Sequence, residues 1–158
     1  IVMALMHNPG VLILDEATTA LDVLTQQQIM WELKQLQKQF RFTLLVISHD
    51  LSVISKLCDR VAVMYCGRIL ETGNTAELLS QPRHPYTKAL IDSYPRLDST
   101  RGTLRGIPGN LPDMSKPIPG CVFADRCRYC SDICRRCCPQ AEAFADYQIS
   151  CHHWRELQ

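Results

Sequence analysis

Two short, uncharged apolar runs on either side of a helical pattern constrain the fold of this 158-residue chain most strongly. Residues 11–14 and 43–47 each end in polar side chains, as strands buried on both faces of a parallel sheet do. Between them, four apolar residues at offsets of four, three and four form one face of a helix over residues 25–40: Ile29, Leu33, Leu36 and Phe40. This strand–helix–strand order predicts an α/β fold.

Further elements are expected after the second run. The pattern predicts a helix, two strands around a tight turn at Cys66 and Gly67, and a helix capped by Asn74. Their expected ranges are 51–58, 61–65, 68–72 and 75–80. Prolines and glycines then crowd residues 95–120. We therefore expect an α/β domain over residues 1–80, a helix and linker over 81–120, and an irregular cysteine-rich segment over 121–158.

Composition narrows the range of partners. The formal net charge is +1, from 17 basic and 16 acidic residues, so no bulk positive charge attracts nucleic acid, and we expect no nucleic-acid partner. The longest apolar runs fall far short of the roughly 20 residues that span a bilayer. The chain starts with Ile1 inside an apolar pattern, with no basic segment before it. We expect it to be a piece of a longer protein.

Polar side chains that suit phosphoryl transfer follow both predicted strands. Asp15 and Glu16 come after the first strand, and His49 comes after the second. The carboxyl ends of neighbouring parallel strands meet at one edge of a sheet. There, one carboxylate can hold Mg²⁺, the other can act as general base, and the histidine can contact a transferring phosphate. A solvated acidic loop and a structural histidine are the alternatives.

Three segments resemble motifs of the ABC-type ATPases. They are residues 11–16 (Walker B), 19–22 (D-loop) and 48–50 (switch histidine). The resemblance implies that Asp15 holds the Mg²⁺ of ATP, that Glu16 is the catalytic base, and that His49 contacts the γ-phosphate. It places Asp22 beside the nucleotide at a dimer interface. Most members have proline after the catalytic glutamate, whereas this chain has Ala17, which loosens the turn.

One branch of that family is indicated by Gln-Pro-Arg-His-Pro-Tyr-Thr at residues 81–87 together with the cysteine segment. Both resemble the ATP-binding subunits of oligopeptide/dipeptide-type ABC importers. The two prolines around His84 would also suit nothing more than a rigid start to a helix at Tyr86. The resemblance implies uptake of peptides or similar solutes, a second ATP-binding subunit, integral membrane permease partners, and a peripheral position on the cytoplasmic face of the inner membrane.

The motifs that bind phosphate and complete the site are missing from these residues. The chain contains no G-x-x-x-x-G-K-[ST] loop, and neither the family's glutamine loop nor its signature motif. We therefore expect this chain alone neither to bind ATP tightly nor to hydrolyse it.

Seven of the nine cysteines lie in residues 121–158: Cys121, Cys127, Cys130, Cys134, Cys137, Cys138 and Cys151. Only three residues separate the two C-x2-C pairs, against the roughly 15–20 of a zinc ribbon. Four thiolates on an irregular loop suit an iron–sulfur cluster. One candidate ligand set is close to the bacterial ferredoxin pattern: Cys127, Cys130, Cys134 and Cys138. Zinc and free thiols are the alternatives.

The importer resemblance implies a [4Fe–4S] cluster on a different set, Cys121, Cys127, Cys134 and Cys151, which leaves three thiols over. The sequence leaves two other functions open. One is an iron–sulfur or zinc module on a catalytically dead ATPase remnant. The other is an ABC-type ATPase that acts on DNA, which the balanced charge disfavours.

Overall fold

The chain divides into two compact units, residues 1–59 and 60–158. The structure is a computed structural model that describes residues 2–19, 21–94 and 106–157. Helices and strands alternate through the first unit and are mixed in the second, which confirms a mixed α/β structure. None of the helices in these ranges is both long and apolar enough to cross a membrane. The division into three domains stays a prediction.

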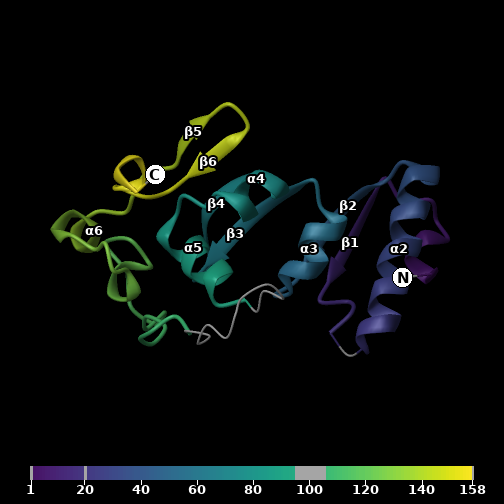
Figure 1. Ribbon diagram of the computed structural model, residues 1–158, viewed down its shortest axis with the longest axis horizontal. Coiled ribbons are helices and arrows are strands. Elements are labelled where there is room, and N and C mark those ends of the chain that lie inside the picture. The colour runs from purple at the N-terminus through teal and green to yellow at the C-terminus, as the bar shows by residue number, and fades with distance from the viewer. Residues whose placement is uncertain (1, 20, 95–105, 158) are drawn as a thin grey trace. The chain divides into compact units, whose positions relative to one another are not determined.

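The first unit contains a parallel pair of strands and three helices (Figure 1). They are α1 (Val2–Leu5), β1 (Val11–Asp15), α2 (Val23–Phe40), β2 (Thr43–Ile47) and α3 (Leu51–Leu57). The pairing of β1 and β2 runs in register from Val11 opposite Thr43 to Asp15 opposite Ile47. The two strands therefore end side by side, as their predicted ranges require.

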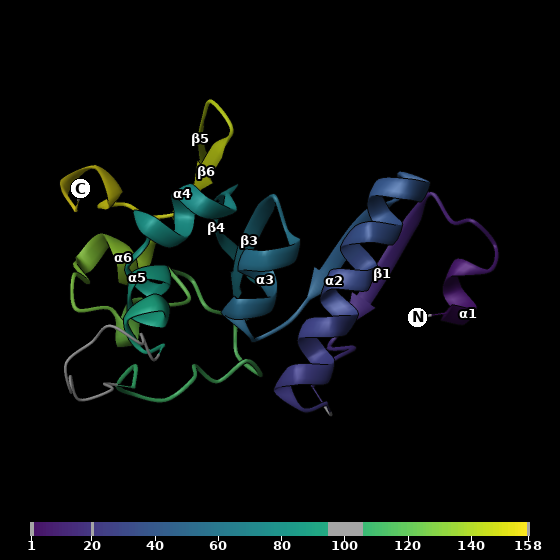
Figure 2. The ribbon, with the colours of Figure 1, turned by 45° about the vertical axis from the view of Figure 1, so that its right-hand side comes forward.

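The apolar face of α2 covers one face of this strand pair (Figure 2). Leu12 and Leu14 of β1 pack with Leu33 of α2, and all three are almost fully buried. On the opposite face, Ile13 of β1 and Leu45 of β2 are exposed by 60% and 51%. Burial on both faces was the expectation, and among the described residues it holds on one face only.

The second unit is built on an antiparallel sheet with the strand order β3-β4-β6-β5. Its elements are β3 (Arg60–Tyr65), β4 (Arg68–Asn74), α4 (Thr75–Ser80), α5 (Pro85–Asp92), a 3-10 helix at Ala124–Arg126, α6 (Asp132–Arg136), β5 (Glu142–Phe144), β6 (Tyr147–Ile149) and a 3-10 helix at Trp154–Glu156. The turn between β3 and β4 has positive φ at Cys66 (46°) and Gly67 (72°), which suits a two-residue hairpin. Among the described strands, the expectation of a mostly parallel sheet thus holds for β1 and β2 alone.

The cysteine-rich segment is part of this sheet rather than an irregular tail. Its strand β6 pairs with β4, with Glu71 opposite Ile149, and β5 pairs with β6 (Figure 1). Ile149 and Leu78 of α4 are fully buried and pack with Val63 and Trp154 in the core of the unit. Of the expected linker, residues 95–105 lie outside the described residues, and 106–120 form neither helix nor strand.

Candidate functional site

The parallel pairing of β1 and β2 brings two of the predicted catalytic residues together. The backbone N–H of Glu16 donates to the carbonyl of Ile47, at 2.9 Å, which extends the ladder by one residue. The Nδ1 atom of His49 lies 3.1 Å from Oε1 of Glu16. Both side chains are open to solvent, with exposed fractions of 52% for Glu16 and 72% for His49. A water molecule or a ligand can therefore reach this carboxylate–imidazole pair.

The backbone of Glu16 is in the left-handed region, with φ of 45°. For a residue with a side chain this conformation costs about 1–2 kcal/mol. A tight turn holds it there, because both the N–H and the hydroxyl of Thr19 donate to the Glu16 carbonyl, at 3.2 and 3.0 Å. The turn changes the chain's direction directly after β1 and turns the Glu16 side chain toward β2.

Asp15 and Asp22 occupy different positions around this pair. Asp15 is the exposed last residue of β1. Asp22 caps α2, because its Oδ1 accepts from the N–H groups of Leu24 and Thr25 at 3.1 and 3.0 Å. The hydroxyl of Thr25, at 2.7 Å from Oδ2, lowers the pKa of Asp22 below its usual value, and the Thr25 N–H adds to this. Asp22 thus has a clear structural role as a helix cap.

The second unit contains a cavity lined by four cysteines: Cys121, Cys127, Cys134 and Cys151. These are the four of the importer-like set, whereas Cys130 and Cys138 of the ferredoxin-like set do not line it. All nine cysteines are free thiols. Cys138 lies elsewhere and accepts a hydrogen bond from Nη1 of Arg68 at 2.6 Å. Position thus separates the two candidate ligand sets.

A glycine allows two of these cysteines to approach each other. The backbone N–H of Cys121 donates to the carbonyl of Cys134 at 2.7 Å. A Cβ atom on Gly120 would lie 2.2 Å from that carbonyl oxygen and 2.6 Å from the carbonyl oxygen of Arg135. No side chain fits there. Sequence reasoning assigned Gly120 to the linker and missed this role.

Burial favours the protonated form of three thiols of the cavity. Burial raises the pKa of Cys121 and of Cys151 to about 11, and it raises the pKa of Cys127 as well. Each of these thiols is also influenced by the charge that its neighbours in the cavity would carry. A metal centre bound here must therefore displace protons from the thiols.

The donor set suits some metal centres better than others. Within the described ranges, no three His, Cys, Asp or Glu side chains are placed to hold a single metal ion. A [4Fe–4S] cluster instead takes each cysteine on a different iron, so its thiolates stand further apart. Of the four free thiols around the cavity, Cys134 is buried and the other three are partly exposed.

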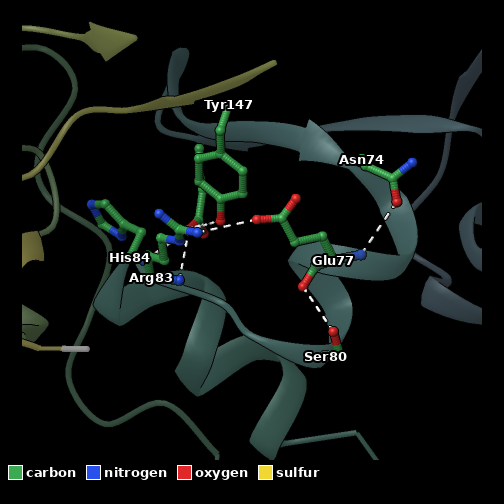
Figure 3. A network of polar contacts seen from close by, with 7 residues as sticks. Asn74, Glu77, Ser80, Arg83, His84 and Tyr147 are labelled. Carbon is green, nitrogen blue, oxygen red and sulfur yellow. Dashed lines mark hydrogen bonds and ion pairs between the residues drawn. The ribbon is translucent and has the colours of Figure 1, made fainter. Parts of the chain in front are cut away.

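A buried carboxylate fixes the chain beside the cavity. Glu71 of β4 is fully buried, and its Oε1 accepts from the N–H groups of Arg83 (2.7 Å) and His84 (3.0 Å) and from the hydroxyl of Tyr147 (2.5 Å). Arg83 also donates to Glu77 at 3.1 Å (Figure 3). Sequence reasoning missed Glu71, because a single glutamate in a strand reads as a solvent-facing residue.

His84 lines the cavity and caps α5, which begins at Pro85. Its Nδ1 accepts from the N–H of Tyr86 at 3.0 Å, and proline suits the first position of a helix. The structural interpretation of the 81–87 string, a rigid start of a helix, is confirmed, with the start one residue earlier than expected. Burial lowers the pKa of His84 to about 4, and the Ser150 backbone opposes this in part. The ring is therefore neutral at pH 7.

Comparison with known proteins identifies related sequences. Residues 70–134 match the family model "Oligopeptide/dipeptide transporter, C-terminal region". The chain is 44% identical over 145 residues to the oligopeptide transport ATP-binding protein OppD of Salmonella typhimurium, covering 92% of this chain and 43% of the relative. It is 43% identical over 152 residues to the dipeptide transport ATP-binding protein DppD of Bacillus subtilis, covering 96% of this chain and 45% of the relative.

A third relative is the dipeptide transport ATP-binding protein DppD of Caldanaerobacter subterraneus, 40% identical over 157 residues, which are 99% of this chain and 48% of the relative. The chain thus spans less than half the length of these curated relatives.

Proposed function

Because this chain resembles the C-terminal part of the ATP-binding subunits of oligopeptide/dipeptide-type ABC importers, we propose that it belongs to an ATP-hydrolysing subunit that powers uptake of peptides or similar small solutes. The observation that carries the proposal is the Glu16–His49 pair at the carboxyl ends of two parallel strands. A base held by a neighbouring imidazole, and open to solvent, suits the activation of a water molecule for attack on a phosphate.

Each residue of the pair has a distinct task in this proposal. Glu16 accepts a proton from the attacking water, and His49 orients the Glu16 carboxylate and contacts the γ-phosphate. Asp15, one residue before Glu16 and exposed at the end of β1, is the residue that would hold Mg²⁺. The magnesium ion, when bound, neutralises charge on the phosphates. Asp22 caps α2 and belongs, in this proposal, to the contact with a second ATP-binding subunit beside the nucleotide.

The proposed assembly follows from the same likeness. Two ATP-binding subunits, identical or different, close on ATP, and integral membrane permease subunits move the solute when the pair opens. The subunit lies at the cytoplasmic face of the inner membrane as a peripheral protein. The 158 residues hold no G-x-x-x-x-G-K-[ST] loop, so we propose that by themselves they do not turn over ATP.

A chimera tests this function directly. The corresponding region of the Salmonella relative is replaced by this chain, and the chimera is assayed for ATP hydrolysis and for peptide uptake in cells that lack the native subunit. Both activities are expected, and both should be lost in the Glu16→Gln chimera while ATP binding persists. Uptake that does not depend on Glu16 contradicts the proposal. So does a folded but inactive chimera, when a control protein with the same junctions is active. The isolated chain serves as the negative control, and specific ATP turnover by it would refute its proposed inactivity.

A second function, cluster binding, is favoured by the four-thiol cavity. We propose that Cys121, Cys127, Cys134 and Cys151 hold a [4Fe–4S] cluster, which cross-links residues 121 to 151 and so stabilises a segment with few apolar residues. The family description and the names of the relatives concern transport and ATP binding, so this proposal rests on the cavity alone. Cluster binding is proposed in addition to the ATPase function. No observation supports the alternative of a cluster on a catalytically dead ATPase remnant.

Metal analysis tests the cluster. Iron, acid-labile sulfide and zinc are measured per chain after anaerobic purification, together with the visible spectrum. Near-equal iron and sulfide with a brown absorbance is the expected result. Zinc without sulfide, or neither metal, refutes cluster binding and leaves the ATPase proposal standing.

A further inference from the structure

The Nε2 atom of His84, a residue that lines the cysteine cavity, has no role in the proposed ATP hydrolysis or as a cluster ligand. The N–H of Tyr86 occupies Nδ1 of His84 as an acceptor, so the neutral ring carries its proton on Nε2. That Nε2 atom is buried and no acceptor of the described structure lies in hydrogen-bonding geometry with it, although the Ser150 backbone is near enough to raise the pKa of the ring. The residue as a whole is only 1% exposed, so water does not replace the missing acceptor. A buried donor without an acceptor costs about 1–3 kcal/mol.

The position of the ring indicates which acceptor it lacks. His84 lines the same cavity as the four cysteines, and its ring centroid lies 6.2 Å from that of Phe123, a further wall of the cavity. Figure 3 shows the His84 ring turned away from Tyr147, on the side of the chain opposite to the Arg83–Glu77 contact. Capping of α5 uses Nδ1 alone and leaves Nε2 unexplained.

The backbone of His84 is also held by the buried carboxylate of Glu71. Glu71 accepts its N–H at 3.0 Å and the N–H of Arg83 at 2.7 Å, and Tyr147 donates to the same carboxylate oxygen. Fixed donors of this kind are how proteins adjust metal–sulfur centres from outside the ligand set.

We propose that His84 donates a hydrogen bond from Nε2–H to sulfur of the metal centre in this cavity, either a cysteine thiolate or a cluster sulfide. The inference rests on the proposed [4Fe–4S] cluster. Reduction adds negative charge to the cluster, so a donor to its sulfur stabilises the reduced form more than the oxidised form. His84 therefore raises the reduction potential of the centre and slows its loss.

Two substitutions separate this donor from the capping role. His84→Asn keeps an oxygen acceptor at the cap, where asparagine is favourable, but has no donor at the Nε2 position. His84→Gln extends an amide N–H to about that position and is a poorer cap. The matched control is His152→Asn, since His152 lines the same cavity but has Nε2 2.9 Å from the Cys137 carbonyl, an acceptor already in place.

The measurements are the midpoint potential of the anaerobically purified full chain and the rate at which a chelator removes its iron. For His84→Asn we expect the one-electron equilibrium to shift about tenfold toward the oxidised form. This corresponds to a fall of the midpoint potential by about 59 mV. Iron loss should be faster. His84→Gln should restore part of both effects, and His152→Asn should match the wild type. In the metal-free proteins, His84→Asn should have a higher Tm than His84→Gln, because asparagine is the better helix cap.

The failures are distinguishable. Wild-type protein without iron and sulfide overturns the cluster proposal and this inference together. A loaded wild type with an unchanged potential in His84→Asn overturns this inference alone and assigns the ring to the nearby Ser150 backbone. If His84→Asn does not fold, pulsed electron paramagnetic resonance of the reduced wild type with ¹⁵N-histidine decides. A weak nitrogen coupling that persists in His152→Asn and His153→Asn is expected, and its absence refutes the hydrogen bond.

Discussion

Replacing Tyr147 by phenylalanine removes a single hydroxyl group from the interior of the second unit. That hydroxyl donates to Oε1 of Glu71 at 2.5 Å, and Tyr147 is 4% exposed, so water does not compensate for its loss. The ring itself stays packed against Phe144, with centroids 5.2 Å apart, because phenylalanine keeps the same shape. The variant therefore reports on the hydrogen bond with little change in packing.

The expected loss of stability is large for one atom. A hydrogen bond to a charged group contributes about 1.5–3 kcal/mol. In a unit of this size each kcal/mol lowers Tm by about 4–8 °C. We therefore expect Tyr147→Phe to lower Tm by about 6 °C or more at pH 7. The control is Glu77→Gln, which removes the exposed pair with Arg83 at 3.1 Å and should cost about 1 kcal/mol or less.

The assay is thermal unfolding followed by circular dichroism, repeated as a double-mutant cycle with Glu71→Gln. Burial, and then the hydrogen bond to Glu71, raise the pKa of Tyr147 above its usual value of 10.0. The protonated hydroxyl thus stabilises the fold fully below pH 10, and this contribution is lost as the pH rises further. The wild type should therefore lose its advantage over Tyr147→Phe above pH 10. A Tm within 2 °C of wild type at pH 7, or additive effects in the cycle, would refute the reasoning.

The remaining predictions concern the two proposed centres. In the active chimera, Glu16→Gln should slow ATP turnover on the order of 10²–10⁴-fold without preventing ATP binding, and substantial hydrolysis would exclude Glu16 as the base. His49→Ala should reduce kcat more than nucleotide affinity; an unchanged kcat would exclude a phosphate contact. Ala17→Pro should stiffen the turn after Glu16 and retain the contact of Glu16 with His49, whereas large changes in the His49 ring chemical shifts in nuclear magnetic resonance spectra would contradict this. Cys121→Ser should remove cluster iron and Cys130→Ser should retain it; the opposite ranking would favour the ferredoxin-like ligands.

Local pattern was enough to predict the elements of the first unit. The strand over 43–47 has the predicted bounds, the strand over 11–15 is one residue longer, and the helix starts at Val23 instead of Thr25. Asn74 caps α4 as predicted, with Oδ1 accepting from Ala76 and Glu77. These features depend on neighbouring residues in the sequence, so the sequence displays them directly. The proximity of Glu16 and His49 followed from strand direction in the same way.

Features that depend on distant partners could not be predicted. The strands β5 and β6 have three residues each, too few for an alternating pattern, and β6 exists because β4 pairs with it. Glu71 is buried because its hydrogen-bond donors come from residues 83, 84 and 147. Gly120 is required because the Cys134 carbonyl lies against it. In each case the partner is contributed by another part of the fold, so the single residue gives no local signal.

Because β4 pairs with β6, the second unit cannot complete its sheet until the ribosome has synthesised residues 147–149. Glu71 emerges from the ribosome 76 residues before Tyr147, the residue whose hydroxyl completes its hydrogen bonds. Until then β4 offers an unpaired edge, and a buried acid has no full set of donors. Cys151 follows β6, so the fourth wall of the cavity arrives after the other three. Assembly of the proposed cluster there would consequently be a late event, which follows translation through residue 151.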